Sequence, residues 1–385
     1  MQIISGDHRK YAHFAIQSPE LNMTAVPDKF YFPSLNGLRA IAAFIVLFTH
    51  IERYRQIAGL PYIVSSPVNS FIGGLAVTFF FVLSGFLITS LLVREKTATN
   101  SIRIGRFLKK RMLRIWPLYY AVLIAGYLIS IFLLKDTPPG PWSNGLLLNF
   151  LLLPNITFVL NRIPEILIQI WSIGTEEQFY FLWPFLVKTL RIKTLATVFA
   201  GIVVGWFVAR MVIGLTAGRD SFLNAFLFRT RIDCMAIGGL AALRVTIPGK
   251  SMSGGRMELR PAGGWIITAL LAGLLWISWR LNASIYQCYA VLFAFVILKI
   301  THQPVRLLET RPLKYLGKIS YGIYLLHHFW VYFVFRTWLG RTGFLQDSPA
   351  GDLIAFGLVS LLTVASATLS YELFEKRFLK RKPLS

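Results

Sequence analysis

Two basic residues in the first strongly apolar segment have types and spacing suited to acid–base chemistry. Arg39 and His50 are eleven residues apart. On an α-helix this spacing returns to within about 20° of the same face, with a rise of roughly 16 Å. One helix face would then carry a cation for an anionic ligand and, further along, a titratable base. The alternative is that Arg39 extends to the membrane surface and that His50 lies at the interface, close to Glu52 and Arg53.

A pair of adjacent carboxylates, Glu176 and Glu177, lies near the start of a second apolar segment, 170–188. Glu176 and Tyr180 are four residues apart and therefore share a helix face, whereas Glu177 points about 100° away. One glutamate could orient a histidine or bind a sugar hydroxyl. The competing interpretation is that both are solvated at the interface, with the tryptophans of this segment as anchors.

Two arginines three residues apart, Arg111 and Arg114, share a helical face beside Lys110. Guanidinium groups bind phosphate oxygens with two parallel hydrogen bonds, so this face suits a phosphate-bearing ligand. The alternative is that these residues only add to the general positive charge of their loop.

Two more pairs of ionisable residues occur in later apolar segments. Arg231 and Asp233 are two residues apart, and the simplest interpretation is a local ion pair. His327 and His328 are adjacent in the segment 319–338, so they point in different directions on a helix and at most one is expected to line a central cavity. No histidine or cysteine spacing typical of a metal site occurs in the sequence, so no metal is predicted.

These residues must be positioned by membrane-spanning helices. Of the 385 residues, 55% are hydrophobic and 15% are charged, against about 25% charged in soluble proteins. Apolar segments long enough to cross a hydrocarbon core of roughly 30 Å recur along the chain. We therefore predict an all-α, polytopic transmembrane helix bundle of about ten spans. The expected spans are 36–57, 70–93, 113–134, 170–188, 194–214, 230–246, 263–280, 284–301, 319–338 and 352–373.

The positive charge has a strongly uneven distribution. The net charge is +23, and the basic residues concentrate in alternate connections and in the C-terminal tail. The positive-inside rule then places both termini in the cytosol and explains the charge without a nucleic-acid partner. The expected organisation is a cytosolic tail over 1–33, a membrane domain over 34–376 and a basic cytosolic tail over 377–385.

Six segments, in order, resemble the acyltransferase-3 family of integral membrane O-acyltransferases, which includes O-antigen and exopolysaccharide O-acetyltransferases. They are LNGLRAIAAFIVLFTH at 35–50, FFFVLSGFLIT at 79–89, RFLKKRMLRIWPLYY at 106–120, WSIGTEEQFYFLWP at 171–184, RTRIDCMAIGGLAA at 229–242 and YLGKISYGIYLLHH at 315–328. Two departures are visible. Asn36 stands where the family usually has aspartate, and Gly174 where it often has serine.

The resemblance implies roles for the residues singled out above. It implies catalytic functions for His50, Glu176 and Glu177, and acyl-CoA binding by Arg39, Arg111 and Arg114. Further candidates for acceptor binding or support are Tyr180, Arg231, Asp233, His327 and His328. Acyl-CoA, usually acetyl-CoA, would be a co-substrate, and no tightly bound cofactor is expected.

The resemblance also implies a reaction and a location. An acyl group would pass from cytosolic acyl-CoA to a hydroxyl of a cell-surface or lipid-linked glycan. The protein would cross the bacterial cytoplasmic (inner) membrane many times, with the lipid bilayer, acyl-CoA and the glycan as its partners. Two alternatives stay open, because buried ionisable groups also suit transport. They are a non-catalytic carrier of a glycan or glycolipid, and a subunit of a polysaccharide assembly complex.

Overall fold

The computed structural model describes residues 31–135, 142–218, 220–246, 273, 286–338 and 349–380, and it contains no strand in these ranges. The expected span 263–280 therefore lies outside the described residues, except for a single position. Residues 1–30 and 381–385, which make up most of the two expected tails, also lie outside the described residues.

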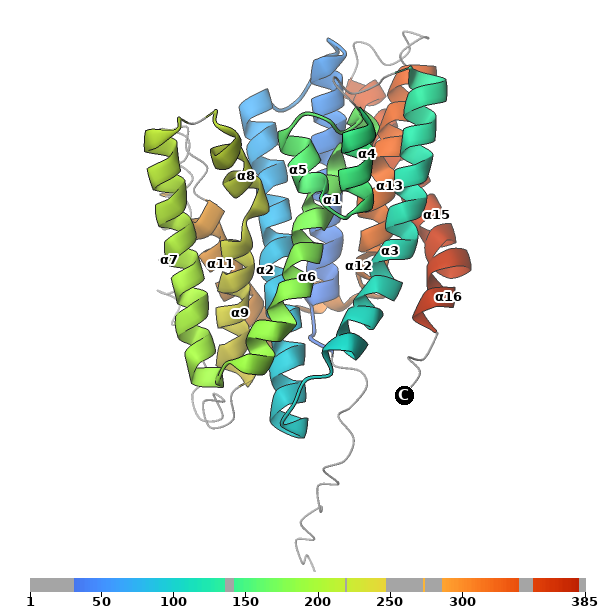
Figure 1. Cartoon of the computed structure of the whole chain (residues 1–385). Helices are drawn as coiled ribbons and strands as arrows, with labels where there is room; N and C mark the ends of the chain where they lie inside the picture. The colour runs from blue at the N-terminus through green and yellow to red at the C-terminus, as the bar shows by residue number, and fades with distance from the viewer. Residues whose placement is uncertain are drawn as a thin grey trace, which may run out of the picture. The chain divides into compact units, whose positions relative to one another are not determined.

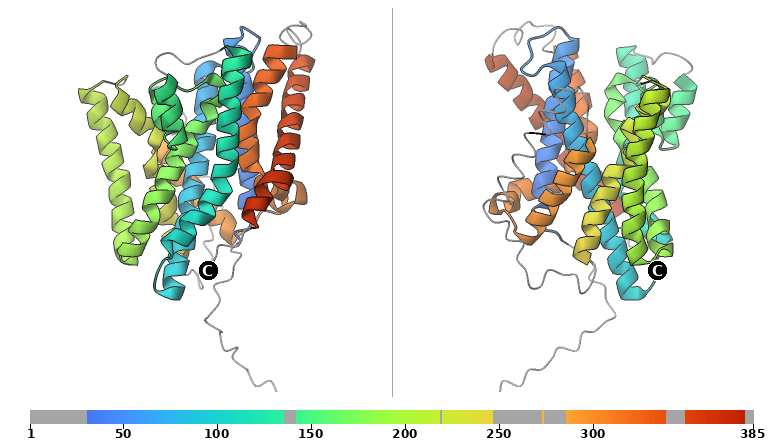
Figure 2. Two further views of the ribbon diagram at one scale, coloured as in Figure 1. Left: turned by 45° about the vertical axis from the view of Figure 1, so that its right-hand side comes forward. Right: turned by 90° about the vertical axis from the view of Figure 1, so that its left-hand side faces the viewer.

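Every other expected span coincides with a helix. The long helices are α1 (Leu35–Ile57), α2 (Ser66–Thr99), α3 (Ile104–Leu128), α6 (Trp171–Thr189), α7 (Ile192–Thr216), α9 (Ile232–Thr246), α11 (Tyr286–His302), α13 (Ser320–Tyr332) and α15 (Pro349–Leu369). Three continue as π-helical turns, η1 (Ile129–Leu134), η4 (Phe333–Trp338) and η5 (Ser370–Glu375), and α16 (Lys376–Leu379) follows the last of them. Figure 1 and Figure 2 show the long helices side by side between the same two ends.

The helices have the length and composition of membrane spans. Within the described ranges, five stretches are long and apolar enough to cross a bilayer, at Leu35–Ile57, Ser66–Thr99, Ile104–Leu134, Ile192–Thr216 and Leu353–Leu379, and α11 is a shorter apolar helix. Helix α7 buries only 6% of its apolar window and lies at the edge of the bundle in Figure 1. A helix that exposes so much apolar surface needs lipid around it. The chain is a multi-pass membrane protein.

Glycines allow the central helices α2 and α9 to pack closely. A side chain at Gly85 would overlap the carbonyl of Met235, and one at Gly238 would overlap the carbonyl of Val82. Lipid tails are as apolar as leucine, so the hydrophobic effect does not drive helices together within a bilayer. Close backbone packing of this kind stabilises their association instead.

The long connection between α3 and α6 forms three short helices. These are α4 (Trp142–Phe150), α5 (Pro154–Val159) and the 3₁₀-helix η2 (Glu165–Ile170). Helix α5 packs against α6 and against the short helix α8 (Phe222–Thr230). In Figure 1 these short helices lie at the upper end of the bundle, the end at which α1 finishes.

The opposite end is organised around Glu309 in the short helix η3 (Arg306–Glu309), which contacts α1. Its carboxylate accepts hydrogen bonds from the Ser34 backbone N–H and from the Tyr31 hydroxyl, and lies 3.6 Å from the Lys314 ammonium. Burial acts to raise the pKa of Glu309, but these hydrogen bonds and Lys314 outweigh it and leave the pKa below its ordinary value. Burial and the bond to Glu309 raise the pKa of Tyr31 to about 12. These contacts fix the beginning of α1.

Candidate active site

A histidine pair links α1 to α13. The Nδ1 atom of His50 lies 2.7 Å from the Nε2 atom of His327, and the two rings stack with centroids 4.9 Å apart. His328 packs edge-on against His50 at a centroid distance of 4.4 Å. Both α13 histidines therefore contact His50. Unlike His50, neither of them lines the cavity that is described below.

The hydrogen bonds of His327 fix the tautomer of His50. The Nδ1 atom of His327 lies 2.7 Å from the carbonyl oxygen of Tyr324. A carbonyl only accepts, so Nδ1 of His327 carries the proton and, in the neutral ring, Nε2 is an acceptor. His50 must then donate from Nδ1, which leaves the lone pair of its Nε2 free. This is the arrangement of a general base whose orientation is set by a second residue.

Tyr324 is itself fixed in place by the segment before α6. Its hydroxyl lies 2.7 Å from the Ser172 hydroxyl and donates to the Gln169 carbonyl at 2.8 Å. The Gln169 amide donates to the backbone carbonyl of Leu325 at 2.9 Å. The turn of α13 that carries His327 is therefore bound to η2 and α6 by side-chain hydrogen bonds.

The three histidines also form a possible metal cluster. One ring nitrogen from each of His50, His327 and His328 lies within 4.8 Å of the others. Neutral imidazoles are common metal ligands, and both ring nitrogens of His328 are buried without a hydrogen-bond partner. The spacing rules did not identify this group because 277 residues separate His50 from His327. In this cluster the ring nitrogens of His50 and His327 that face each other are joined by a hydrogen bond.

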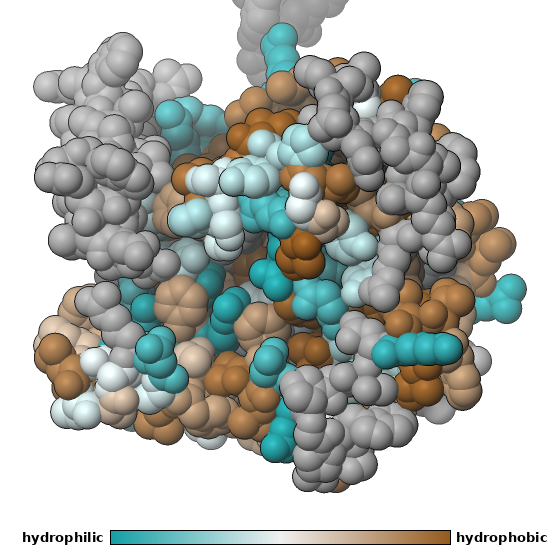
Figure 3. Space-filling model, turned by 90° about the horizontal axis from the view of Figure 1, so that it is seen from above, coloured by the Kyte–Doolittle hydropathy of each residue, from teal (hydrophilic) through white to brown (hydrophobic). Residues whose placement is uncertain are grey.

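His50 lines a cavity of about 440 Å³, within the range of small-molecule sites. Figure 3, seen from the end at which α1 finishes, shows hydrophilic side chains in the middle of this face with hydrophobic ones around them. The polar lining residues are Thr49, His50, Arg53, Asn69, Ser70, Arg229, Arg231, Tyr286 and Tyr324, and Phe158, Trp171 and Phe228 are aromatic neighbours. The cavity therefore places a basic nitrogen next to donors that can bind a polar ligand.

A second polar cluster lies around Arg39, roughly 16 Å back along α1. The carboxylate of Glu176 accepts hydrogen bonds from Ser84 and Tyr180, both at 3.0 Å. The Arg111 guanidinium lies 5.7 Å from the centre of the Tyr180 ring. Arg39 interacts electrostatically with Glu176, Arg111 and also Arg114, and its Nε is buried without a partner. The three predicted phosphate-binding arginines are thus brought together, and the predicted pairing of Glu176 with Tyr180 is confirmed.

The expectation that a glutamate orients His50 is not what the structure shows. Glu176 binds Ser84 and Tyr180, and Glu177 accepts a 2.8 Å hydrogen bond from the Trp116 indole. The partner of His50 is His327. Periodicity placed the glutamates on the correct helix faces, but it could not show at which depth each face meets its neighbours.

The predicted ion pair between Arg231 and Asp233 does not form. Arg231 donates instead to the carbonyls of Phe228 and Gly74 at 3.0 and 2.9 Å, and to the Thr78 hydroxyl at 2.8 Å. The Oδ1 atom of Asp233 is buried without a hydrogen-bond partner. The helix breaks at Arg231, where φ is +37°, and the guanidinium is directed to acceptors on α8 and α2 rather than to Asp233.

Sequence reasoning did not identify several residues of these clusters. Ser84 and Trp116 lie in two of the segments quoted above for the family resemblance, but nothing in their local pattern indicated a glutamate partner. Tyr324 is one helical turn before His327, so its hydroxyl and carbonyl were available clues. Arg229 begins the quoted segment RTRIDCMAIGGLAA, yet only the fold shows that it lines the cavity.

Comparison with known proteins shows the family to which the chain belongs. The model of the acyltransferase domain family, acyltransferase-3, matches residues 32–372, which is most of the chain. The chain belongs to the acyltransferase-3 family. The family is one of acyltransferase domains.

Named O-acetyltransferases are similar to the chain in sequence. The chain is 26% identical to the peptidoglycan O-acetyltransferase of Listeria monocytogenes, over 77% of this chain and 49% of that protein. It is 25% identical to a putative O-acetyltransferase of Staphylococcus aureus, over 91% and 58% of the two chains. A putative peptidoglycan O-acetyltransferase of Bacillus subtilis is 28% identical, over 77% and 48%. The chain thus spans about half of the length of these relatives. No solved structure matches it.

Proposed function

We propose that this protein moves an acyl group, acetyl in the simplest case, from cytosolic acyl-CoA to a hydroxyl of a cell-surface or lipid-linked glycan. The observation that carries the proposal is the hydrogen bond between His50 and His327, which leaves the Nε2 lone pair of His50 free beside a cavity. Family membership and the names of the relatives support the reaction class.

The proposed chemistry uses His50 as general base. Its Nε2 takes the proton of the acceptor hydroxyl while the hydroxyl oxygen attacks the thioester carbonyl carbon. The carbon–sulfur bond then breaks, and the thiolate of coenzyme A takes the proton from His50. The products are an ester on the glycan and free coenzyme A. His327 holds the His50 ring in the tautomer that this step requires.

The arginine cluster is the proposed docking place for the donor. Arg39, Arg111 and Arg114 would bind the phosphates of acyl-CoA, since guanidinium groups suit phosphate oxygens. The pantetheine arm would then cover the rise of roughly 16 Å along α1 between Arg39 and His50. Glu176 would hold the cluster together through its charge and its bonds to Ser84 and Tyr180.

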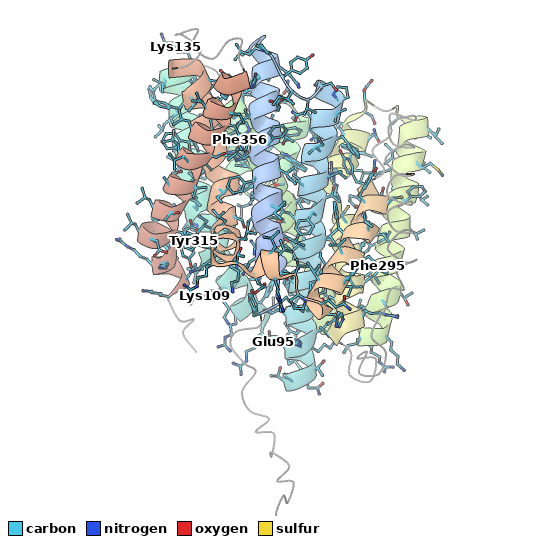
Figure 4. The ribbon with its side chains drawn as sticks, turned by 180° about the vertical axis from the view of Figure 1, so that it is seen from behind. Glu95, Lys109, Lys135, Phe295, Tyr315 and Phe356 are labelled. Carbon is cyan, nitrogen blue, oxygen red and sulfur yellow. The ribbon has the colours of Figure 1, made fainter. Side chains whose placement is uncertain are left out.

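The distribution of charge supports an inner-membrane topology. Basic residues concentrate at the end of the bundle where α1 begins, and Figure 4 places Lys109 at that end and Lys135 at the other. The positive-inside rule assigns the first end to the cytosol of a bacterial cell. The arginine cluster would then face the cytosolic donor, and the cavity beside His50 would face the outer side.

The proposal can be tested with the full-length protein in lipid nanodiscs. His50→Ala should abolish acyl transfer but retain acetyl-CoA binding, whereas the double variant Arg111→Ala and Arg114→Ala should bind acetyl-CoA less tightly. The matched control is His302→Ala, because His302 is exposed at the end of α11. Normal transfer by the His50 variant would remove this residue from the mechanism. Absence of transfer and of acyl-CoA hydrolysis in the unchanged protein would favour a carrier instead.

A further inference from the structure

The cavity beside His50 is lined by three arginines, two of which lack a carboxylate partner among the described residues. The lining includes Arg53, Arg229 and Arg231 and no aspartate or glutamate. Arg53 is paired with Glu165 at 3.3 Å, and no ion pair joins Arg229 or Arg231 to a residue that the structure describes. Uncompensated charge in a bundle interior is costly and marks a site for a ligand of opposite charge.

Arg229 is the cation left available for a ligand. Its guanidinium lies 4.3 Å from the centre of the Phe158 ring and 5.4 Å from that of Trp171. No hydrogen bond or ion pair joins it to any residue in the described part of the chain. Two further arginines, Arg53 and Arg231, are close enough to repel it. An anion in the cavity would relieve this repulsion and bind the free N–H groups of Arg229.

The backbone conformation at the neighbouring Arg231 helps to place both guanidinium groups at the cavity. It adopts a φ of +37°, which is unfavourable for a residue with a side chain. Its guanidinium is held by the carbonyls of Phe228 and Gly74 and lies 3.6 Å from the centre of the Tyr286 ring. The break between α8 and α9 thereby places Arg229 and Arg231 in the wall of one cavity.

We infer that the acyl acceptor is an anionic glycan, and that Arg229 binds its carboxylate or phosphate while a hydroxyl of the same molecule reaches His50. This inference rests on the proposed function, and it adds the chemical class of the acceptor. Both His50 and Arg229 line the cavity, so one ligand can contact both. A sugar acid and a phosphorylated, lipid-linked sugar share the required charge.

The test measures binding of four matched disaccharides to the full-length protein in nanodiscs made of neutral lipid. The probes are cellobiose, cellobiouronic acid, the methyl ester of that acid, and cellobiose 1-phosphate. The acid or the phosphate should bind roughly ten- to a hundredfold more tightly than cellobiose and the ester, as expected for hydrogen bonds to a charged group. Tighter binding of cellobiouronic acid than of cellobiose 1-phosphate would indicate that the acceptor is a sugar acid. Tighter binding of the phosphate would indicate a phosphorylated acceptor.

Variants then assign the selectivity to one residue. Arg229→Gln should remove the preference for the charged probes, Arg229→Lys should keep part of it, and Arg191→Gln should keep all of it. Arg191 is a suitable control because it is exposed and precedes α7. Equal binding of all four probes by the unchanged protein, binding of none, or an unaltered preference in Arg229→Gln would overturn the inference.

Acyl transfer to the same probes separates this inference from the proposed function. Charge-selective binding without any transfer from acetyl-CoA would retain the anion site and refute the proposed reaction. Transfer at equal kcat/KM to the acid and to its ester would retain the reaction and refute the anion site.

Discussion

The hydrogen bond between His50 and His327 gives each ring a different role. His50 lines the cavity and keeps a free nitrogen, whereas His327 is buried and uses both of its nitrogens to bind Tyr324 and His50. In a site of low polarity such a bond fixes the ring more strongly than it would in water. In the proposed mechanism His327 would position the ring of His50, and its contribution can be separated from that of the proposed base.

Substituting His327 should lower kcat in a way that depends on which nitrogen is replaced. His327→Asn keeps a donor near Nδ1 but removes the acceptor for His50, whereas His327→Gln places an amide oxygen near Nε2. We expect kcat of the Asn variant to fall by at least about tenfold, but by less than the roughly 10²- to 10⁴-fold that a general base contributes. The Gln variant should retain more activity, and KM for acetyl-CoA should not change.

The measurement is steady-state acyl transfer by each variant, with His302→Asn as the control for a histidine outside the site. Equal losses in the Asn and Gln variants would argue that His327 only fills space. A change in KM for acetyl-CoA without a change in kcat would place His327 in donor binding instead.

Sequence patterns located individual residues on helix faces but did not pair residues from different helices. Arg39 and His50 were predicted to share a face of one helix, and they lie in two clusters along α1 as that spacing requires. The partner of His50 was not predictable, because rotation and depth of α13 relative to α1 depend on packing between distant segments. Arg231 and Asp233 were predicted to pair because they are close in sequence, whereas the acceptors that bind Arg231 include Gly74 and Thr78, which lie more than 150 residues away in the sequence.

The position of a helix in the bundle depends on a few close contacts with its neighbours. Some of these contacts require a glycine. Helix α9 lies so close to α2 that a methyl group at Gly238 would overlap the Val82 carbonyl. Gly205 on α7, in contrast, has open space around it. Both are helical glycines, so they form a matched pair for testing the packing.

Gly238→Ala should destabilise the protein and Gly205→Ala should not. Overpacking a close contact costs roughly 1 to 3 kcal/mol, whereas alanine in an unobstructed helix is better than glycine by roughly 0.5 to 1 kcal/mol. The midpoint of thermal unfolding in detergent should therefore fall for the first variant and rise slightly for the second. A similar shift in both would show that α2 and α9 do not pack as described.

The beginning of α1 should depend on the ionisation of Glu309. Its pKa in the folded protein lies below the ordinary value, because hydrogen bonds and Lys314 outweigh the opposing effect of burial. The ionised form therefore stabilises the fold above the unfolded pKa of about 4.3, and this stabilisation is lost as the pH falls through the folded pKa.

Glu309→Gln should accordingly lower the unfolding midpoint at neutral pH by a small amount. For a partly exposed group the difference should be less than about 1 kcal/mol. It should shrink as the pH falls below about 4.3 and vanish once the pH is below the folded pKa. Asp220→Asn is the control, since Asp220 is exposed and has no hydrogen bond to a described residue. A difference between wild type and Glu309→Gln that persists at low pH would show that the carboxylate charge is not what stabilises α1.

The whole molecule places its two polar clusters towards opposite ends of one bundle. The arginines lie near the end with most basic residues, and the cavity beside His50 opens towards the other end, where Figure 4 shows Lys135. The membrane-spanning character of the helices was predictable from length and composition. The depth of each cluster was not, because it depends on helix breaks and short connecting helices such as α4 and α5. In the proposed reaction, this arrangement would let donor and acceptor enter from opposite ends of the bundle.

The most direct test of the account is acyl transfer across a sealed membrane. Proteoliposomes with one protein orientation would receive acetyl-CoA on the side of Lys109 and an acceptor glycan, identified by the binding test above, on the side of Lys135. We predict that the glycan becomes O-acetylated only with this placement of the substrates, and that His50→Ala abolishes the product. Equal product when both substrates are on the side of Lys109, or undiminished product in the His50 variant, would contradict the account.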